Sequence, residues 1–182
     1  VIGFPMKNFQ TWRPAVTVVA QIFVFLLWLF LLVQGGDTGT MWLPIVNPVD
    51  LTLLGIFGLL AVWLRSDLVT KNLSSSYLSI FFLLVVTLSN ITLRSVHHFT
   101  DAPWSIDLWD SAAAQMSLTI VWTLLGMINW IVGSKRGNRG LWKVGAVLIS
   151  IVLVKLLLVD RSHLGALMGI ASFIGYGVLC LA

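Results

Sequence analysis

Long apolar runs separated by short polar segments make up most of the chain. Six of them approach the roughly 20 residues that a membrane-spanning helix requires. They cover residues 14–33, 49–64, 77–96, 109–132, 141–159 and 164–182. Their uniform apolar character lacks the alternation that is typical of a membrane β-barrel. The pattern therefore predicts an all-α fold, a polytopic transmembrane helix bundle of about six spans in a single domain over residues 1–182.

The composition supports a membrane environment. Hydrophobic residues make up 58% of the 182 residues and charged residues only 10%, whereas a soluble domain carries about 25% charged residues. A chain this apolar needs the bilayer as its solvent. The basic residues are spread among short loops, so the net charge of +4 does not indicate nucleic-acid binding. We expect membrane lipids and further transmembrane helices as partners.

The charges separate onto alternate loops. Lys and Arg gather before the first run, between the second and third runs, and from the end of the fourth run to the start of the fifth. These basic residues are Lys7, Arg13, Arg65, Lys71, Lys135, Arg136, Arg139 and Lys143. The other loops carry Asp37, Asp50, Asp101, Asp107, Asp110 and Asp160, against Arg94 and Arg161. The positive-inside rule then places both the N-terminus and the C-terminal edge in the cytoplasm.

The segment RSVHHFTDAPWSIDLWD, residues 94–110, joins two apolar runs and holds most of the unusual polar residues. His97, His98 and Asp101 are candidate catalytic residues, because imidazole and carboxylate groups transfer protons near neutral pH. A zinc site is less favoured, since adjacent histidines on a helix point about 100° apart. A structural role, in which interfacial histidines cap the third helix, is favoured over both of these interpretations. We predict no metal.

Several charged residues lie at a similar depth near the outer ends of the runs. They are Asp50, Arg94, Asp110, Lys155 and Asp160. Charges in a membrane are costly alone and much less so together. We therefore predict a charge network beneath the histidine segment. Lys155 also has the alternative of reaching the headgroups at the surface.

Small and polar residues at helical spacing predict contacts between helices. Gly165 and Gly169 form a GxxxG pattern, which is typical of close helix packing in membranes. Gln115 belongs to a polar stripe on the fourth run, for which interhelical hydrogen bonding and a substrate path are both open. Walker, GxGxxG, GxSxG and CxxCH motifs do not occur, so we predict no cofactor.

Four stretches carry a family resemblance. They are NPVDL at 47–51, LWKVGA at 141–146, VKLLLVD at 154–160 and SFIG at 172–175. From Asn47 onward the chain resembles the C-terminal end of a bacterial family of very large polytopic membrane proteins, domain of unknown function 2339. It departs from that pattern at Arg161, where a less charged residue is expected. The resemblance implies further spans before Val1 and an inner-membrane location, but no agreed catalytic residues.

Three functional hypotheses follow. The first is a structural or accessory module in envelope or transport machinery, which needs only packed interfaces. The second is an envelope enzyme, such as a transferase on a lipid-linked glycan, that uses His97, His98 and the outer carboxylates. The third is a transporter segment that uses Lys155 and the Gln115 stripe. The chain starts at Val1 and ends in an apolar run, so we expect it to be a piece of a longer protein, and the resemblance implies that it is the C-terminal part.

Overall fold

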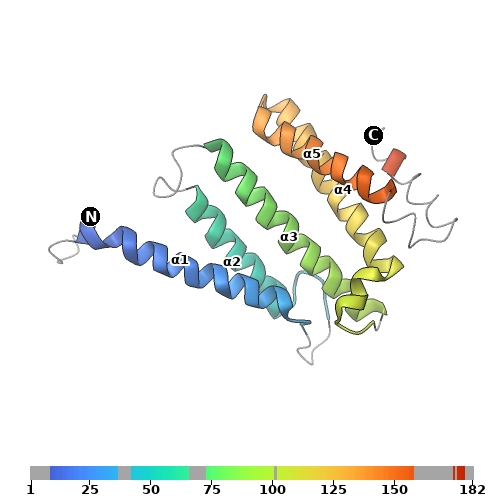
Figure 1. The fold of residues 1–182 in the computed structure, drawn as a ribbon, viewed down its shortest axis with the longest axis horizontal. Coiled ribbons are helices and arrows are strands. Elements are labelled where there is room, and N and C mark those ends of the chain that lie inside the picture. The colour runs from blue at the N-terminus through green and yellow to red at the C-terminus, as the bar shows by residue number, and fades with distance from the viewer. Residues whose placement is uncertain are drawn as a thin grey trace.

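The computed structural model describes residues 9–36, 42–65, 73–100, 102–157, 174 and 176–178, and these ranges contain helices and no strand. The elements are α1 (Phe9–Val33), α2 (Pro48–Leu64), α3 (Leu73–Thr100), the 3-10 helix η1 (Ile106–Asp110), α4 (Ala112–Lys135) and α5 (Arg139–Lys155). Successive α-helices run up and down (Figure 1). The all-α prediction is confirmed for this part of the chain.

Three of these helices are long and apolar enough to cross a membrane: Ala15–Val33, Tyr77–Thr100 and Ala112–Lys135. α2 is also apolar but has 17 residues, or roughly 26 Å at 1.5 Å of rise per residue. α5 has the same length, and most of the predicted span 164–182 lies outside the described residues. The structure thus supports three candidate spans, and the count of six stays a prediction.

The helices start where local residues satisfy their first amide groups. Asn47 caps α2 by accepting a hydrogen bond from the amide of Asp50 (2.9 Å), and Pro48 occupies the first turn, where a missing N–H costs nothing. Ser111 caps α4 in the same way. The residues just before Ser111 form η1, so α4 begins at Ala112 and not at the predicted residue 109.

α3 lies at the centre of the bundle, in contact with α2, α4 and α5. In the most apolar stretch of α3, 44% of the residues are buried, against 6% in that of α1. Two hydrophobic clusters follow α3 along its length. One joins α1, α2 and α3 through Trp28, Leu53, Leu60, Leu83 and Ile91. The other joins α3, η1 and α4 through Leu93, Val96, Leu108, Ala114 and Leu118. α3 is therefore the helix that the two clusters share.

Glycines bring α4 and α5 into close contact. A Cβ atom on Gly145 would lie 2.5 Å from the backbone nitrogen of Trp130 and 2.7 Å from the carbonyl oxygen of Gly126. A Cβ atom on Gly133 would overlap the backbone of Trp142. Small residues let helix backbones approach in this way inside membranes. The predicted packing residues Gly165 and Gly169 lie outside the described residues, so that prediction is untested.

We expect Gly145→Ala to lower stability in detergent by about 1–3 kcal/mol, because the added methyl group meets backbone that has little room to move. The matched control is Gly58→Ala on α2, where an added Cβ atom meets nothing within 4 Å. Thermal unfolding of the two variants, followed by circular dichroism, tests this. Equal melting temperatures would show that the backbones of α4 and α5 separate easily.

Candidate functional site

The C-terminal end of α1 is closed by side chains from elsewhere in the chain. The last carbonyl groups of a helix have no partner inside that helix. Here Arg94 donates hydrogen bonds to Gln34 O (2.9 Å) and to Leu31 O. Asn90 donates to Leu32 O (2.8 Å), and Trp104 donates to Val33 O (2.8 Å). Four consecutive carbonyls are therefore capped by α3 and by the segment that follows it.

Arg94 also forms an ion pair with Asp50. Its Nη1 lies 2.7 Å from Asp50 Oδ1, and both side chains are 0% exposed. The other carboxylate oxygen of Asp50 accepts from Asn47 Nδ2 (2.5 Å) and from the amide of Ile45 (3.3 Å). Asp50 lies in the first turn of α2 and Arg94 beside the last turn of α1. Each charge thus faces the helix end whose dipole favours it.

The connection between α1 and α2 packs tightly on this pair. Gly36 adopts a φ of +86°, which favours glycine, and a Cβ atom there would lie 3.0 Å from the Trp42 ring and 3.4 Å from Arg94 Cδ. Ile45 has a φ of +71°, which is rare for a β-branched residue. Its amide donates to Asp50, so the strained turn contributes directly to the site.

His97 and His98 lie in the last turn of α3, next to the ion pair along the chain. The His98 ring stacks on Trp42, with centroids 3.9 Å apart. His97 Nδ1 forms a hydrogen bond with Ala102 O, which fixes the turn after the helix. Both rings are half-buried. The third candidate catalytic residue, Asp101, lies outside the described residues. The catalytic prediction for this set is therefore untested.

The described residues contain no group of three His, Cys, Asp or Glu side chains arranged to hold a metal ion. The two imidazoles tilt by 56° with centroids 4.7 Å apart. Each imidazole also contacts a tryptophan ring. His98 stacks on Trp42, and the ring centroids of His97 and Trp104 are 5.8 Å apart. This environment orients the histidines by packing.

A second polar contact lies between α4 and α5. Lys155 Nζ donates to the carbonyl oxygen of Gln115 (3.1 Å) and to Thr119 Oγ1 (2.8 Å). Gln115 is buried, and its side-chain amide donates to Trp109 O. The ammonium group of Lys155 is thus directed toward α4 and not only toward the surface. This contact ties the C-terminal end of α5 to the N-terminal end of α4.

The predicted charge network is only partly visible. The structure joins Arg94 to Asp50 and places Lys155 on the polar face of α4. Asp110 is exposed at the end of η1, and Asp160 lies outside the described residues. The network of five residues stays a prediction.

The capping role of Arg94 was not apparent from the sequence. Its two backbone acceptors have no side-chain signature, so only Gly35-Gly36 marked the end of α1. Asn90, a single amide within an apolar run, was the signal that the sequence offered for a partner of α1. Within the described part of the structure, the side chains of Arg94 and Asp50 are both fully buried. The pair therefore joins the ends of two helices, α1 and α2, to α3.

We expect Asp50→Asn to lower stability by about 3–5 kcal/mol, because it leaves the Arg94 guanidinium buried without its counter-charge. Asp107→Asn is the matched control, since Asp107 is exposed at the same end of the bundle. Melting temperatures in one detergent provide the comparison. A small loss, equal to that of the control, would mean that water reaches Arg94.

The double variant Asp50→Leu with Arg94→Met separates pairing from capping. Replacing a buried ion pair by apolar residues is often neutral. Here we expect a remaining loss of about 1–3 kcal/mol, because Gln34 O loses its Arg94 donor and Leu31 O keeps only the bond from the Gln34 amide (3.3 Å). Full recovery of the wild-type melting temperature would show that the capping bonds of Arg94 contribute nothing.

The comparisons with known proteins agree with the helical, apolar character of the chain. No curated protein and no solved structure matches it. A family model described as "Predicted membrane protein (DUF2339)" matches residues 6–182, which confirms the family resemblance of the sequence. The chain belongs to this family of membrane proteins, to which no function is assigned.

Proposed function

We propose that the chain is a structural or accessory helix-bundle module of the bacterial inner membrane, crossing it several times and packing against other spans in envelope or transport machinery. The observation that carries the proposal is the closed Arg94–Asp50 pair. A charge pair that served a substrate would need an open side. This one is fully buried and bonded to the ends of α1 and α2.

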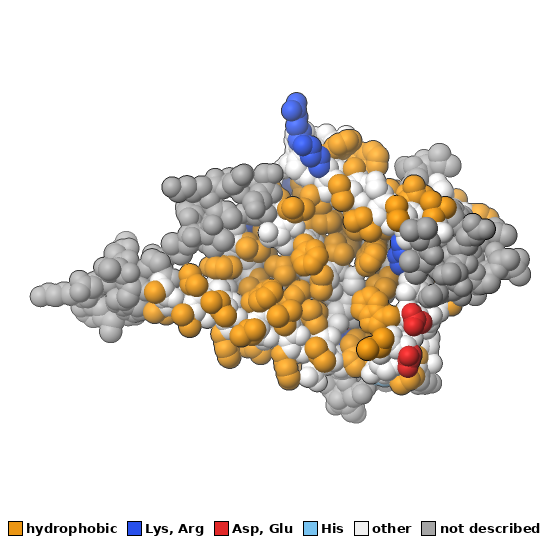
Figure 2. Space-filling model, viewed as in Figure 1, with side chains coloured by type: hydrophobic (Ala, Val, Ile, Leu, Met, Phe, Trp, Pro, Cys, Tyr) orange, Lys and Arg blue, Asp and Glu red, His pale blue; other side chains and the backbone are white. Residues whose placement is uncertain are grey.

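The surface of α1 supports the same proposal. Its span is almost uncovered by the rest of the structure, and apolar side chains occupy the face drawn in Figure 2 over α1, α2 and α3. Apolar side chains on a membrane helix contact lipid tails or other helices. An uncovered helix fixed at one end by buried hydrogen bonds suits a module that offers a side for assembly.

The enzyme and transporter alternatives rest on fewer observations. An enzyme would use the half-buried His97 and His98 beside the acidic end. A transporter would use the polar stripe of α4, but Thr119 and Thr123 there donate to carbonyls of their own helix, at Gln115 and Thr119. Such bonds are ordinary for hydroxyl side chains in membrane helices. Packing therefore accounts for the stripe.

The proposed orientation has the basic end in the cytoplasm. Basic side chains project at the top of Figure 2, and acidic side chains lie at the lower right. The turn between α4 and α5 carries Lys135, Arg136 and Arg139, all exposed, whereas η1 carries Asp107 and Asp110. The bias of Lys and Arg toward the cytoplasm is the physical basis for the proposal.

A cysteine-labelling experiment tests this orientation. In a Cys180→Ser background, we expect Asp107→Cys to react with a membrane-impermeant maleimide in intact cells. Ser134→Cys, at the opposite end, should react only after the cells are opened. The reverse pattern would invert the orientation, and labelling of both in intact cells would contradict the up-and-down arrangement.

A second experiment compares function with stability. We expect His97→Ala and Lys155→Met to complement a deletion strain in proportion to their melting temperatures, because a scaffold fails only when it unfolds. Gly145→Ala, which disturbs packing far from the histidines, is the matched comparison. Loss of complementation by His97→Ala at an unchanged melting temperature would favour the enzyme alternative.

A further inference from the structure

Two apolar grooves flank a single ridge on α3. Leu78 and Phe82, four residues apart, line both grooves and are 60% and 64% exposed. Residues four apart lie on one face of a helix, so these two side chains form a continuous ridge. Ser79 and Leu83 face the first groove, and Phe81 and Val85 face the second. The grooves therefore lie side by side.

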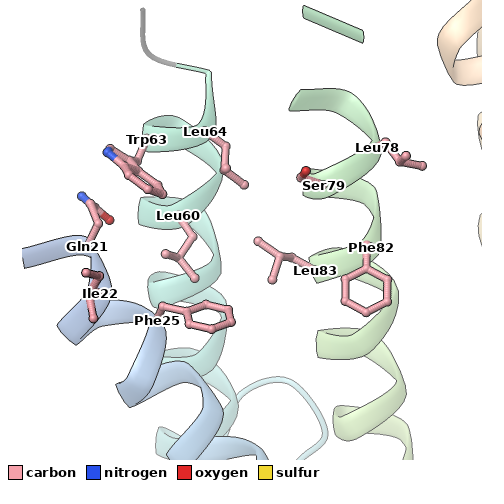
Figure 3. Close-up of a pocket in the computed structure, with 10 residues that line it drawn as sticks. All are labelled: Gln21, Ile22, Phe25, Leu60, Trp63, Leu64, Leu78, Ser79, Phe82 and Leu83. Atoms are coloured by element: carbon pink, nitrogen blue, oxygen red, sulfur yellow. The ribbon is translucent and has the colours of Figure 1, made fainter. Parts of the chain in front are cut away.

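The first groove lies between α3 and the pair α1 and α2, as Figure 3 shows. Its volume is about 710 Å³, and its lining is almost wholly apolar. Phe25, Leu60 and Trp63 form the wall opposite α3, with Gln21 as a polar side chain from α1 (Figure 3). The groove ends at Leu64, and Arg65 follows directly, with its side chain exposed.

The second groove lies between α3 and the pair α4 and α5, with a volume of about 350 Å³. Trp122, Val147 and Ile151 contribute to its apolar lining, and Lys143 is the one charged residue in it. Along α5, the groove extends from Lys143 to Ile151, which is roughly 12 Å at 1.5 Å of rise per residue. It is thus a long slot with a cation at its basic end.

Three positive features lie at the same end of the bundle, where α2 ends and where α3 and α5 begin (Figure 1). Lys143 lies in the second groove, and Arg65 follows the last residue of the first. α3 begins at Leu73, about a turn beyond Leu78, so the positive end of its dipole lies above the ridge. Helix N-termini favour phosphate groups for this reason. Apolar slots beneath a cationic end suit an amphiphile with an anionic head.

We propose that this surface binds one anionic phospholipid, with an acyl chain in each groove and its phosphate above the ridge, between Arg65 and Lys143. The two slots account for two chains, and the cations account for the headgroup charge. A partner helix, about 10 Å wide, would fill one groove and leave the other empty. The site extends beyond the proposed scaffold role and does not depend on it.

Retention of phosphatidylglycerol by the full-length purified protein tests the proposal. Native mass spectrometry after exchange into detergent should show more bound phosphatidylglycerol than phosphatidylcholine. Lys143→Gln should reduce the bound fraction of phosphatidylglycerol about fivefold, as expected for one basic residue at a lipid surface. Lys135→Gln is the matched control, because Lys135 is exposed at the same end but lines neither groove. Equal losses from both variants, or equal retention of both lipids, would overturn the proposal.

Filling the second groove tests the position of the acyl chain. Val147 lines the groove and is 58% exposed, so Val147→Phe should occupy the slot without disturbing the core. We expect bound phosphatidylglycerol to fall while the melting temperature is kept. Ile128→Phe on α4, exposed and outside both grooves, is the control. Undiminished retention by a folded Val147→Phe would mean that no chain lies there, and if the variant does not fold, Lys143→Gln decides.

Discussion

The end of a helix inside a low-dielectric environment needs hydrogen-bond partners. In the described part of the structure, side chains from α3 and the segment after it provide these partners for the last carbonyls of α1. Each unpaired carbonyl in a membrane costs several kcal/mol. Arg94 meets two of the four and brings a charge that Asp50 balances. The guanidinium suits this position because its planar fork donates in several directions at once. A lysine there would donate from a single point.

The rest of the bundle follows from holding Arg94 in place. α3 carries Asn90 one turn before Arg94, so both side chains reach the same end of α1. The segment after α3 must return so that Trp104 can cap Val33, and the contact between His97 and Ala102 O shapes that return. On the other side, the missing side chain of Gly36 leaves room for the Trp42 ring, and His98 stacks on that ring. The histidines thus have a structural explanation before any chemical one is needed.

Apolar run lengths were enough to predict helices, because bilayer thickness and backbone hydrogen bonding leave few alternatives. The same reasoning placed Asp50 and Arg94 at one depth. It did not show whether Arg94 pairs with Asp50, which is 44 residues away in the sequence, or with Asp110, which lies at the same depth and which the structure leaves exposed. The other contacts of Arg94 and Lys155 could not be predicted, because both side chains donate to backbone carbonyls, and these carry no signal in the sequence. α3 continues to Thr100, and its last turn packs His98 on Trp42 and His97 beside Trp104, which are contacts between separate segments that an apolar run does not predict.

The two ends of the bundle differ in how they are held. At the acidic end, side-chain hydrogen bonds join α1, α2 and α3, and Lys155 joins α5 to α4. At the basic end, α1 diverges from α2 and α3 (Figure 1), and an apolar groove lies on each side of α3. Polar bonds are directional and fix a geometry, whereas apolar contacts in lipid exchange with lipid tails at little cost. The polar bonds at the acidic end hold the helices together, so the proposed lipid site at the other end can be filled or emptied without separating them.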